Sequence, residues 1–246
     1  MMYPSKNEVT KLELATIEVP TLEELRAKRS HAGAGNRWQP IAHIDLIDEI
    51  TGAAEARGLR IAEERYCVSE DRHDVFGFLR FDPESAPAMP DVPGCGIITP
   101  TLGFRHSNMQ RMRLLGVHGE EVSICANGMI SGDFLFGFKG TTGNVSRMEV
   151  GIRDGMQTWD DQAEDARRLI EFLVGEEINS ERADRLLMEG MRRGVFASNQ
   201  LKKIDATYRE YLDESHPHHG AFAPRNLWSL YNAATDVGKA WSVRNV

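Results

Sequence analysis

Side chains that could hold phosphate groups cluster in one short stretch near the middle of the chain. The stretch "RHSNMQRMR" combines guanidinium groups with a hydroxyl and an amide, from Arg105, Ser107, Asn108, Arg111 and Arg113. Such side chains make many of the contacts that proteins form with nucleic-acid backbones. Lys139 follows downstream and could join them. Together these residues form the predicted nucleic-acid-binding set, although a solvated strand face would give the same arginine pattern.

Aromatic residues that could stack on unpaired bases alternate further along the chain. Phe134, Phe136 and Phe138 lie in "FLFGF", so they share one face of a predicted strand. Such a stripe could hold single-stranded nucleic acid. The alternative is that these phenylalanines form the sheet core under helices. Arg37 and Trp38, nearer the N-terminus, could be contacts or only an anchor for the chain.

Nucleophilic catalysis has one candidate centre. Cys125 could be a nucleophile with His118 or His106 as its base, which requires a lowered thiol pKa and a base within hydrogen-bond reach. The segment "VSIC" alternates like a strand, however, and a small buried thiol is the usual explanation for such a cysteine. His118 lies in "VHGEE", which predicts an exposed turn.

Metal binding has two candidate sites. Asp133 with His106, Glu120 or Glu121 could bind a metal ion as in nucleases. The two glutamates are adjacent in a predicted turn, so we expect them to point apart, and no DxE or ExK spacing occurs. The histidines of "HPHH", at 216–219, could hold a transition metal, but loop residues surround them. The sequence therefore predicts no metal, no cofactor and no catalytic residue.

These residues belong to a predicted antiparallel sheet that follows a helix. Isoleucines at helical spacing, with Gly58 after them, predict a helix over 40–58. Runs rich in β-branched and aromatic residues predict strands over 59–69, 74–81, 96–105, 111–117, 121–126, 129–131 and 134–138. Between two of these runs, Asn127-Gly128 predicts a hairpin turn, since both residues tolerate positive φ. The proline-rich stretch 82–93 predicts an exposed loop.

The C-terminal half has helical periodicity. Helices are predicted over 158–175, from 180 toward 190 or 194, over 199–212 and over 225–241. The class is therefore α+β, with a helix and an antiparallel sheet followed by a helical C-terminal half. The predicted divisions are an N-terminal arm (1–39), an α/antiparallel-β core (40–145) and a helical segment packed on the sheet (146–246), together forming one structural unit. Neither GxGxxG nor GxxxxGK[ST] occurs, which argues against those nucleotide-binding folds.

Composition and charge limit the class of protein. The chain has 246 residues, 41% hydrophobic, with a net charge of −8, which argues against a strongly basic nucleic-acid binder. Residues 151–190 hold eleven acidic and five basic side chains, a net of −6, so most of the acidity lies in one helical segment. No apolar run approaches the ~20 residues of a membrane helix, and no signal peptide is visible. With three scattered cysteines, these features predict a cytoplasmic protein with no membrane partner.

The central block of the chain resembles a known family. The stretch "LGFRHSNMQRMRLLGVHGEEVSICANGMISGD" is similar to the middle of the phage- and plasmid-encoded domain of unknown function 932 family. The matching positions are Arg105, Ser107, Gly119, Cys125, Asn127 and Ser131-Gly132-Asp133. The ending "NLWSLYNAATDVGK" is also similar, and the resemblance covers roughly 40–240. A histidine that the family carries after Ser-Gly-Asp has no counterpart in "FLFGFKGTTGNV". The resemblance implies a mobile-element context and supplies no reaction.

Three functions are compatible with these features. The first is a non-enzymatic nucleic-acid-associated protein of a phage or plasmid that binds or anneals single-stranded DNA, by loose analogy with Rad52-type folds. The second is a hydrolase or nuclease centred on Cys125 and Asp133. The third is a host-interaction protein that acts through an acidic helical surface including Asp160, Asp161 and Glu164. The expected partners are single-stranded nucleic acid and a further copy of the chain.

Overall fold

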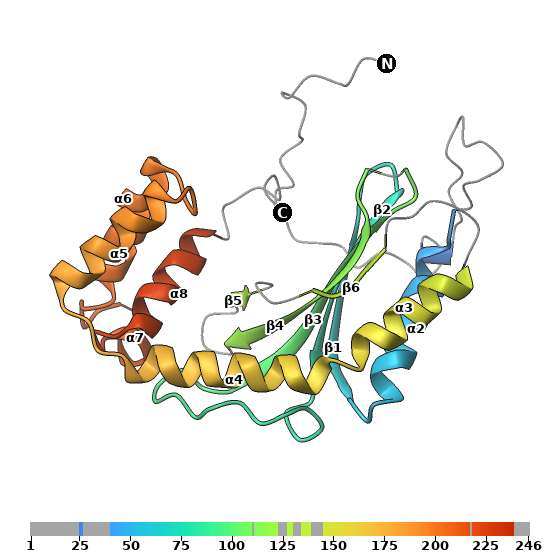
Figure 1. Cartoon of the computed structure of the whole chain (residues 1–246), viewed down its shortest axis with the longest axis horizontal. Coiled ribbons are helices and arrows are strands. Elements are labelled where there is room, and N and C mark those ends of the chain that lie inside the picture. The colour runs from blue at the N-terminus through green and yellow to red at the C-terminus, as the bar shows by residue number, and fades with distance from the viewer. Residues whose placement is uncertain are drawn as a thin grey trace, which may run out of the picture. The chain divides into compact units, whose positions relative to one another are not determined.

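The fold combines an antiparallel sheet with helices (Figure 1). The computed structural model describes residues 25–26, 40–109, 111–122, 127–129, 134–138, 145–216 and 218–238. The described residues divide into two compact units, one within Glu18–Glu171 and the other within Phe172–Val246. The predicted α+β class is confirmed, because the sheet lies in the N-terminal half and helices follow it. The predicted divisions at residues 39 and 145 stay predictions.

The sheet belongs to the first unit and has six strands. They are Ile61–Val68 (β1), Asp74–Phe81 (β2), Ile98–Ser107 (β3), Leu114–Val122 (β4), Asn127–Met129 (β5) and Phe134–Phe138 (β6). Strands β1 to β4 pair in chain order, and all pairs are antiparallel. Both β5 and β6 pair with β4, β5 near its end and β6 near its start. The predicted hairpin of β1 and β2 and the predicted strand at β6 are confirmed.

Two predicted turns around β4 are wrong. The turn expected at His118 is a continuous part of β4, since His118 pairs with Leu102 and Gly119 with Thr101 on β3. Asn127 and Gly128 lie in β5, where Asn127 pairs with Val122, so they do not form the hairpin turn. The ladder to β3 keeps β4 extended through a segment whose polar composition favoured a turn.

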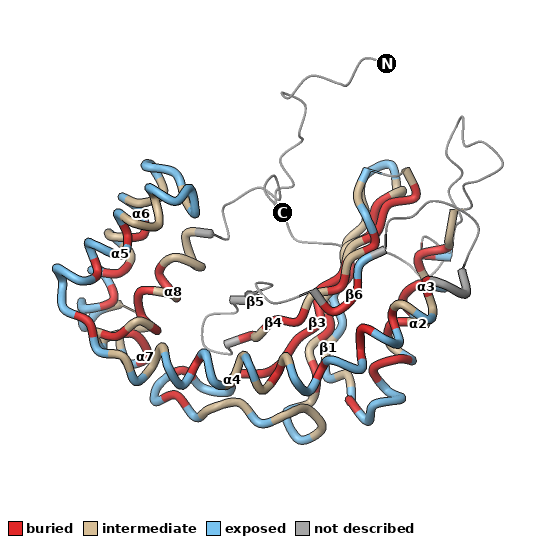
Figure 2. Tube along the Cα trace, in the orientation of Figure 1, coloured by how far each residue is buried: buried red, intermediate tan, exposed pale blue. Residues whose placement is uncertain are grey.

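Two helices cover one face of the sheet. Helix α2 (His43–Glu55) confirms the predicted first helix, and helix α3 (Val145–Met156) was not predicted. They share a core with the sheet that includes Leu46, Ile50, Leu79, Leu102, Ile152 and Met156. Trp159, after α3, packs edge-on against Phe81 with ring centroids 5.0 Å apart. Figure 2 shows β3 buried along nearly its whole length, as expected of a central strand.

Glycines allow the core rings and α3 to approach the sheet closely. A Cβ at Gly77 would lie 2.1 Å from the ring of Phe104, and one at Gly116 would lie 2.2 Å from the ring of Phe136. Each ring therefore lies directly over a glycine. Phe136 is only 6% exposed, so the core alternative holds for this residue and its ring is not available to stack on bases. The side chains of Phe134 and Phe138 lie outside the described residues.

The second unit is helical. Helix α4 (Trp159–Gly175) contains the boundary between the units, and α5 (Ser180–Arg192), α6 (Ser198–Glu210), α7 (His219–Phe222) and α8 (Leu227–Gly238) follow. Asn179 caps α5 by accepting a hydrogen bond from the backbone N–H of Arg182 at 2.8 Å. Buried Ile204, Tyr208 and Trp228 supply apolar side chains to the unit. None of the helices in the described ranges is long and apolar enough to cross a membrane.

Candidate nucleic-acid interface

The two faces of the sheet differ in exposure. Alternation along the paired strands separates the core side chains from those of the opposite face. We call this opposite surface the open face, and its members are Glu63, Arg65, Cys67, Phe76, Phe78, Arg80, Thr99, Thr101, Gly103, Arg105, Leu115, Val117, Gly119 and Glu121. Its aromatic residues, Phe76 and Phe78, are partly exposed, whereas Val75 and Leu79, which flank them on β2, are fully buried in the core. The open face therefore presents ring surface to a ligand.

Phe76 and Phe78 form the aromatic part of the open face. They lie two residues apart on β2, which places both rings on the same side of the strand. Phe76 pairs with Arg105 on β3, and Phe78 pairs with Arg65 on β1. The guanidinium carbon of Arg65 lies 5.1 Å from the centroid of the Phe78 ring. Aromatic rings with stacked guanidinium groups are the surfaces on which proteins hold unpaired bases.

No carboxylate of the described residues compensates the charge of Arg105. It lies on β3 between Phe76 and Leu115, its partners on the neighbouring strands. Among the described residues its side chain has neither a hydrogen-bond nor an ion-pair partner, and its Nε atom is buried. Arg105 as a whole is partly exposed, so an anionic ligand can approach its guanidinium group and form a charge-assisted hydrogen bond with it. Arg105 is therefore the residue of the predicted set that is best placed to bind a phosphate.

A four-residue ion-pair network lies at the other end of the open face. Glu63 accepts from Arg65 Nε at 2.6 Å and from Arg80 Nη2 at 2.9 Å, and Glu121 accepts from Arg65 Nη2 at 3.2 Å. Hydrogen bonding by Arg65, aided by Arg80, lowers the pKa of Glu63 to about 2. The network spans β1, β2 and β4. The arginine side chains reach across β3 to Glu121, because Thr101, the β3 residue paired with Arg80, is small.

Three predicted phosphate contacts have other roles in the structure. Arg111 forms ion pairs with Asp71 and, at 3.2 Å, with Asp74, so its charge is neutralised. Burial alone would raise the pKa of Asp71, but hydrogen bonding, chiefly by Arg111, lowers it to about 2. Ser107 is 1% exposed, and its hydroxyl oxygen accepts hydrogen bonds from the backbone N–H of Met109 at 3.1 Å and of Arg111 at 3.2 Å. Asn108 is fully buried, which also leaves no room for a phosphate at its side chain.

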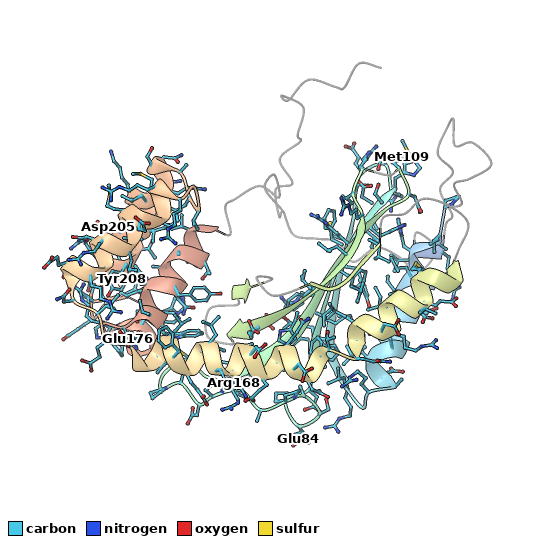
Figure 3. All side chains as sticks on the ribbon, viewed as in Figure 1. Glu84, Met109, Arg168, Glu176, Asp205 and Tyr208 are labelled. Atoms are coloured by element: carbon cyan, nitrogen blue, oxygen red, sulfur yellow. The ribbon has the colours of Figure 1, made fainter. Side chains whose placement is uncertain are left out.

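Asn108 instead connects the sheet to the start of α2. Its side chain accepts the N–H of Ile41 at 3.0 Å and donates to the C=O of Ile41 at 2.9 Å. Met109, labelled in Figure 3, marks this end of the sheet. Ser107, Asn108 and Arg111 thus make contacts within the chain, and the phosphate roles expected for them stay predictions. Arg113 is exposed, and Lys139 lies outside the described residues.

The candidate catalytic residues are only partly described. Cys125 and Asp133 lie outside the described residues. His118, expected in an exposed turn, is 2% exposed, and its Nδ1 lies 3.2 Å from Glu120. Its ring packs against Trp159 with centroids 4.5 Å apart. This buried contact was missed because polar residues in "VHGEE" favoured a turn.

His43, His106 and His216 also pack against other rings. The ring of His106 lies 6.2 Å from that of His43, and burial, with a smaller effect of His43, lowers the pKa of His106 to about 4. This imidazole is therefore neutral at neutral pH. His216 packs against Tyr211 at 5.1 Å. Within the ranges the structure covers, no three His, Cys, Asp or Glu side chains are grouped so as to hold a metal ion.

The acidic helical surface is largely paired. On α4, Asp160 pairs with Arg57, and Glu164 accepts from Arg167 at 2.7 Å and from Arg168 at 2.9 Å. Arg168, labelled in Figure 3, lies on this helix. The acidic side chains of α4 therefore offer a partner less free charge than the sequence suggested.

Comparisons of the chain with protein-family models, curated proteins and solved structures each gave no match. They therefore assign no family to the chain. The resemblance of the central block to the domain of unknown function 932 family stays a proposal. The open face is therefore the feature of the described structure that bears on function.

Proposed function

We propose that the chain binds single-stranded nucleic acid on the open face. Bases stack on Phe76 and Phe78, and Arg105 holds a phosphate between them. The observation that carries the proposal is the uncompensated Arg105 guanidinium beside a partly exposed aromatic ring. Unpaired bases have accessible ring faces, whereas the bases of a duplex are stacked on one another, so a ring platform favours single strands.

Stacking supplies most of the expected affinity. The chain carries a net charge of −8, and the arginines of the ion-pair network are compensated by Glu63 and Glu121. Arg105 and the exposed Arg113 remain as cations without a described partner. Base stacking contributes about 1–3 kcal/mol per base and needs no net positive charge. An acidic protein can therefore bind single strands through this face.

The resemblance of the central block supports a phage or plasmid context for this activity. We expect binding or annealing of single-stranded DNA in the cytoplasm, with a further copy of the chain as a second partner. The hydrolase alternative centres on Cys125 and Asp133, and the host-interaction alternative on the acidic α4 surface. Neither alternative accounts for the exposed rings beside Arg105.

Replacing Arg105 with glutamine is expected to weaken binding about tenfold, since a charged hydrogen bond is lost. Each phosphate contact to a single strand contributes about −0.7 to the slope of log K against log salt. One or two phosphate contacts predict a wild-type slope of about −0.7 to −1.4. In the Arg105→Gln variant the slope should be smaller in magnitude by about 0.7. Fluorescence anisotropy of a labelled oligo-dT at several salt concentrations measures both quantities.

Arg60→Gln is the matched control for this measurement. Arg60 is an exposed arginine of the same unit that pairs with Asp82 at 2.8 Å, and it lies outside the open face. We expect its replacement to leave affinity and slope unchanged. An Arg105→Gln protein with the wild-type slope would show that Arg105 holds no phosphate, and absence of wild-type binding would overturn the proposed function.

A further inference from the structure

The geometry points to a guanine-reading site in the network of Glu63, Arg65, Arg80 and Glu121. The inference rests on the proposed function, since it concerns which base the open face prefers. It adds a specificity that stacking does not provide, because every base has a ring face.

All carboxylate oxygens of the network have partners. Glu63 Oε1 accepts from Arg65 Nε at 2.6 Å, and its Oε2 accepts from Arg80 Nε at 3.1 Å. Glu121 Oε1 accepts from Arg65 Nη2 at 3.2 Å, and its Oε2 lies 3.3 Å from Arg80 Nε. The Nη1 groups of both arginines have no partner within the described part of the chain. Toward a ligand the network therefore offers unoccupied donors and no unoccupied carboxylate oxygen.

The same contacts hold the two arginines in place. Glu121 is only 6% exposed and contacts both guanidinium groups, whose side chains are 45% and 34% exposed. Arg65 also lies over the Phe78 ring at 5.1 Å. The buried Glu121 thus holds both guanidinium groups in place, and both arginine side chains remain partly exposed to solvent. Fixed guanidinium groups lose little conformational entropy on binding, which favours specific recognition.

Guanine is the base whose edge fits two neighbouring donors. It carries the acceptors O6 and N7 side by side, and arginine bound to both is the commonest specific contact to a base. Adenine has an amino donor in place of O6, which would face the guanidinium donors. A base stacked on Phe78 lies beside Arg65, its neighbour on β1, and close to Arg80 two residues along β2. The network can therefore discriminate guanine from adenine.

The test uses a thymine oligonucleotide with one central guanine, compared with oligonucleotides that carry 7-deazaguanine or adenine at that position. 7-Deazaguanine stacks like guanine but lacks N7. For the wild-type protein we expect the adenine oligonucleotide to bind roughly 5- to 100-fold more weakly than the guanine oligonucleotide. The 7-deazaguanine oligonucleotide should bind with an affinity between those two. For Arg80→Gln, all three affinities should become equal.

Arg80→Lys is the second variant, because it keeps the positive charge next to Glu121 but removes the planar fork. It should fold like the wild type and lose the guanine preference. Arg60→Gln should keep the preference. Equal wild-type affinity for the three oligonucleotides would overturn the guanine inference and leave the proposed function intact. Absence of binding to all three would overturn both.

Discussion

Replacing Phe76 and Phe78 together with leucine is expected to lower the affinity for oligo-dT by roughly 30-fold or more. Each ring is proposed to stack one base, and stacking is worth about 1–3 kcal/mol per base. Two lost contacts therefore amount to at least about 2 kcal/mol, and a tenfold change in affinity corresponds to about 1.4 kcal/mol. Leucine keeps an apolar side chain on β2, so the sheet should stay folded. Anisotropy titration measures the loss.

Phe172→Leu provides the matched control for the double variant. Phe172 is a phenylalanine of α4 that is 56% exposed and lies outside the sheet. Its replacement should leave the affinity unchanged. Circular dichroism should show the same secondary structure for all three proteins. A folded double variant that binds oligo-dT as tightly as the wild type would show that bases do not stack on these rings.

Replacing Gly155 with alanine is expected to destabilise the protein by about 3 kcal/mol, toward the upper end of the usual cost of overpacking. A Cβ at this position of α3 would lie 2.2 Å from the backbone oxygen of Leu135 and 2.8 Å from Cβ of Phe136. These atoms belong to β6, so the steric clash can be relieved only if α3 or β6 moves. The free energy of unfolding in urea measures the effect.

Gly52→Ala distinguishes this clash from the intrinsic preference of helices for alanine. Gly52 lies inside α2, and nothing lies within 4 Å of the position its Cβ would take. Alanine there should stabilise the protein by about 0.5–1 kcal/mol. The two substitutions should therefore shift stability in opposite directions. Similar gains from both would mean that α3 does not pack closely against β6.

The periodicity of apolar residues predicted most of the elements but not α3. In α2 the isoleucines repeat at helical spacing, so the helix could be recognised from the sequence. In "VSRMEVGIRDGM" the core residues Met148, Ile152 and Met156 form only a narrow stripe, and the two glycines disfavour a helix. Close packing against β6, which requires Gly155, stabilises this helix. That contact depends on tertiary structure and left no local signal.

The open face could be predicted only in part. The alternation in "DVFGFLRF" separates Phe76 and Phe78 from Val75 and Leu79, but it does not show which pair faces the core. The helices decide this, because they pack against the side of the sheet that carries Leu79.

The charges of the site depend on strand register. Arg111 is neutralised by Asp71 and Asp74, which lie in the β1–β2 connection and at the start of β2, far from it in the sequence. Arg105 has no compensating carboxylate within the described ranges, because its partners across the sheet, Phe76 and Leu115, are apolar. The two arginines look alike in the sequence, and only the pairing of β3 with β2 and β4 distinguishes their surroundings.

Ultraviolet cross-linking of an oligonucleotide that contains 5-iodouracil, followed by trypsin digestion and mass spectrometry, tests the central claim most directly. Cleavage after Arg72 and Arg80 releases "HDVFGFLR", residues 73–80, which contains both Phe76 and Phe78. We predict that this peptide carries the cross-linked nucleotide and that an excess of unlabelled oligo-dT removes the signal. Cross-links confined to peptides of residues 172–238, with this peptide unmodified, would contradict binding on the open face.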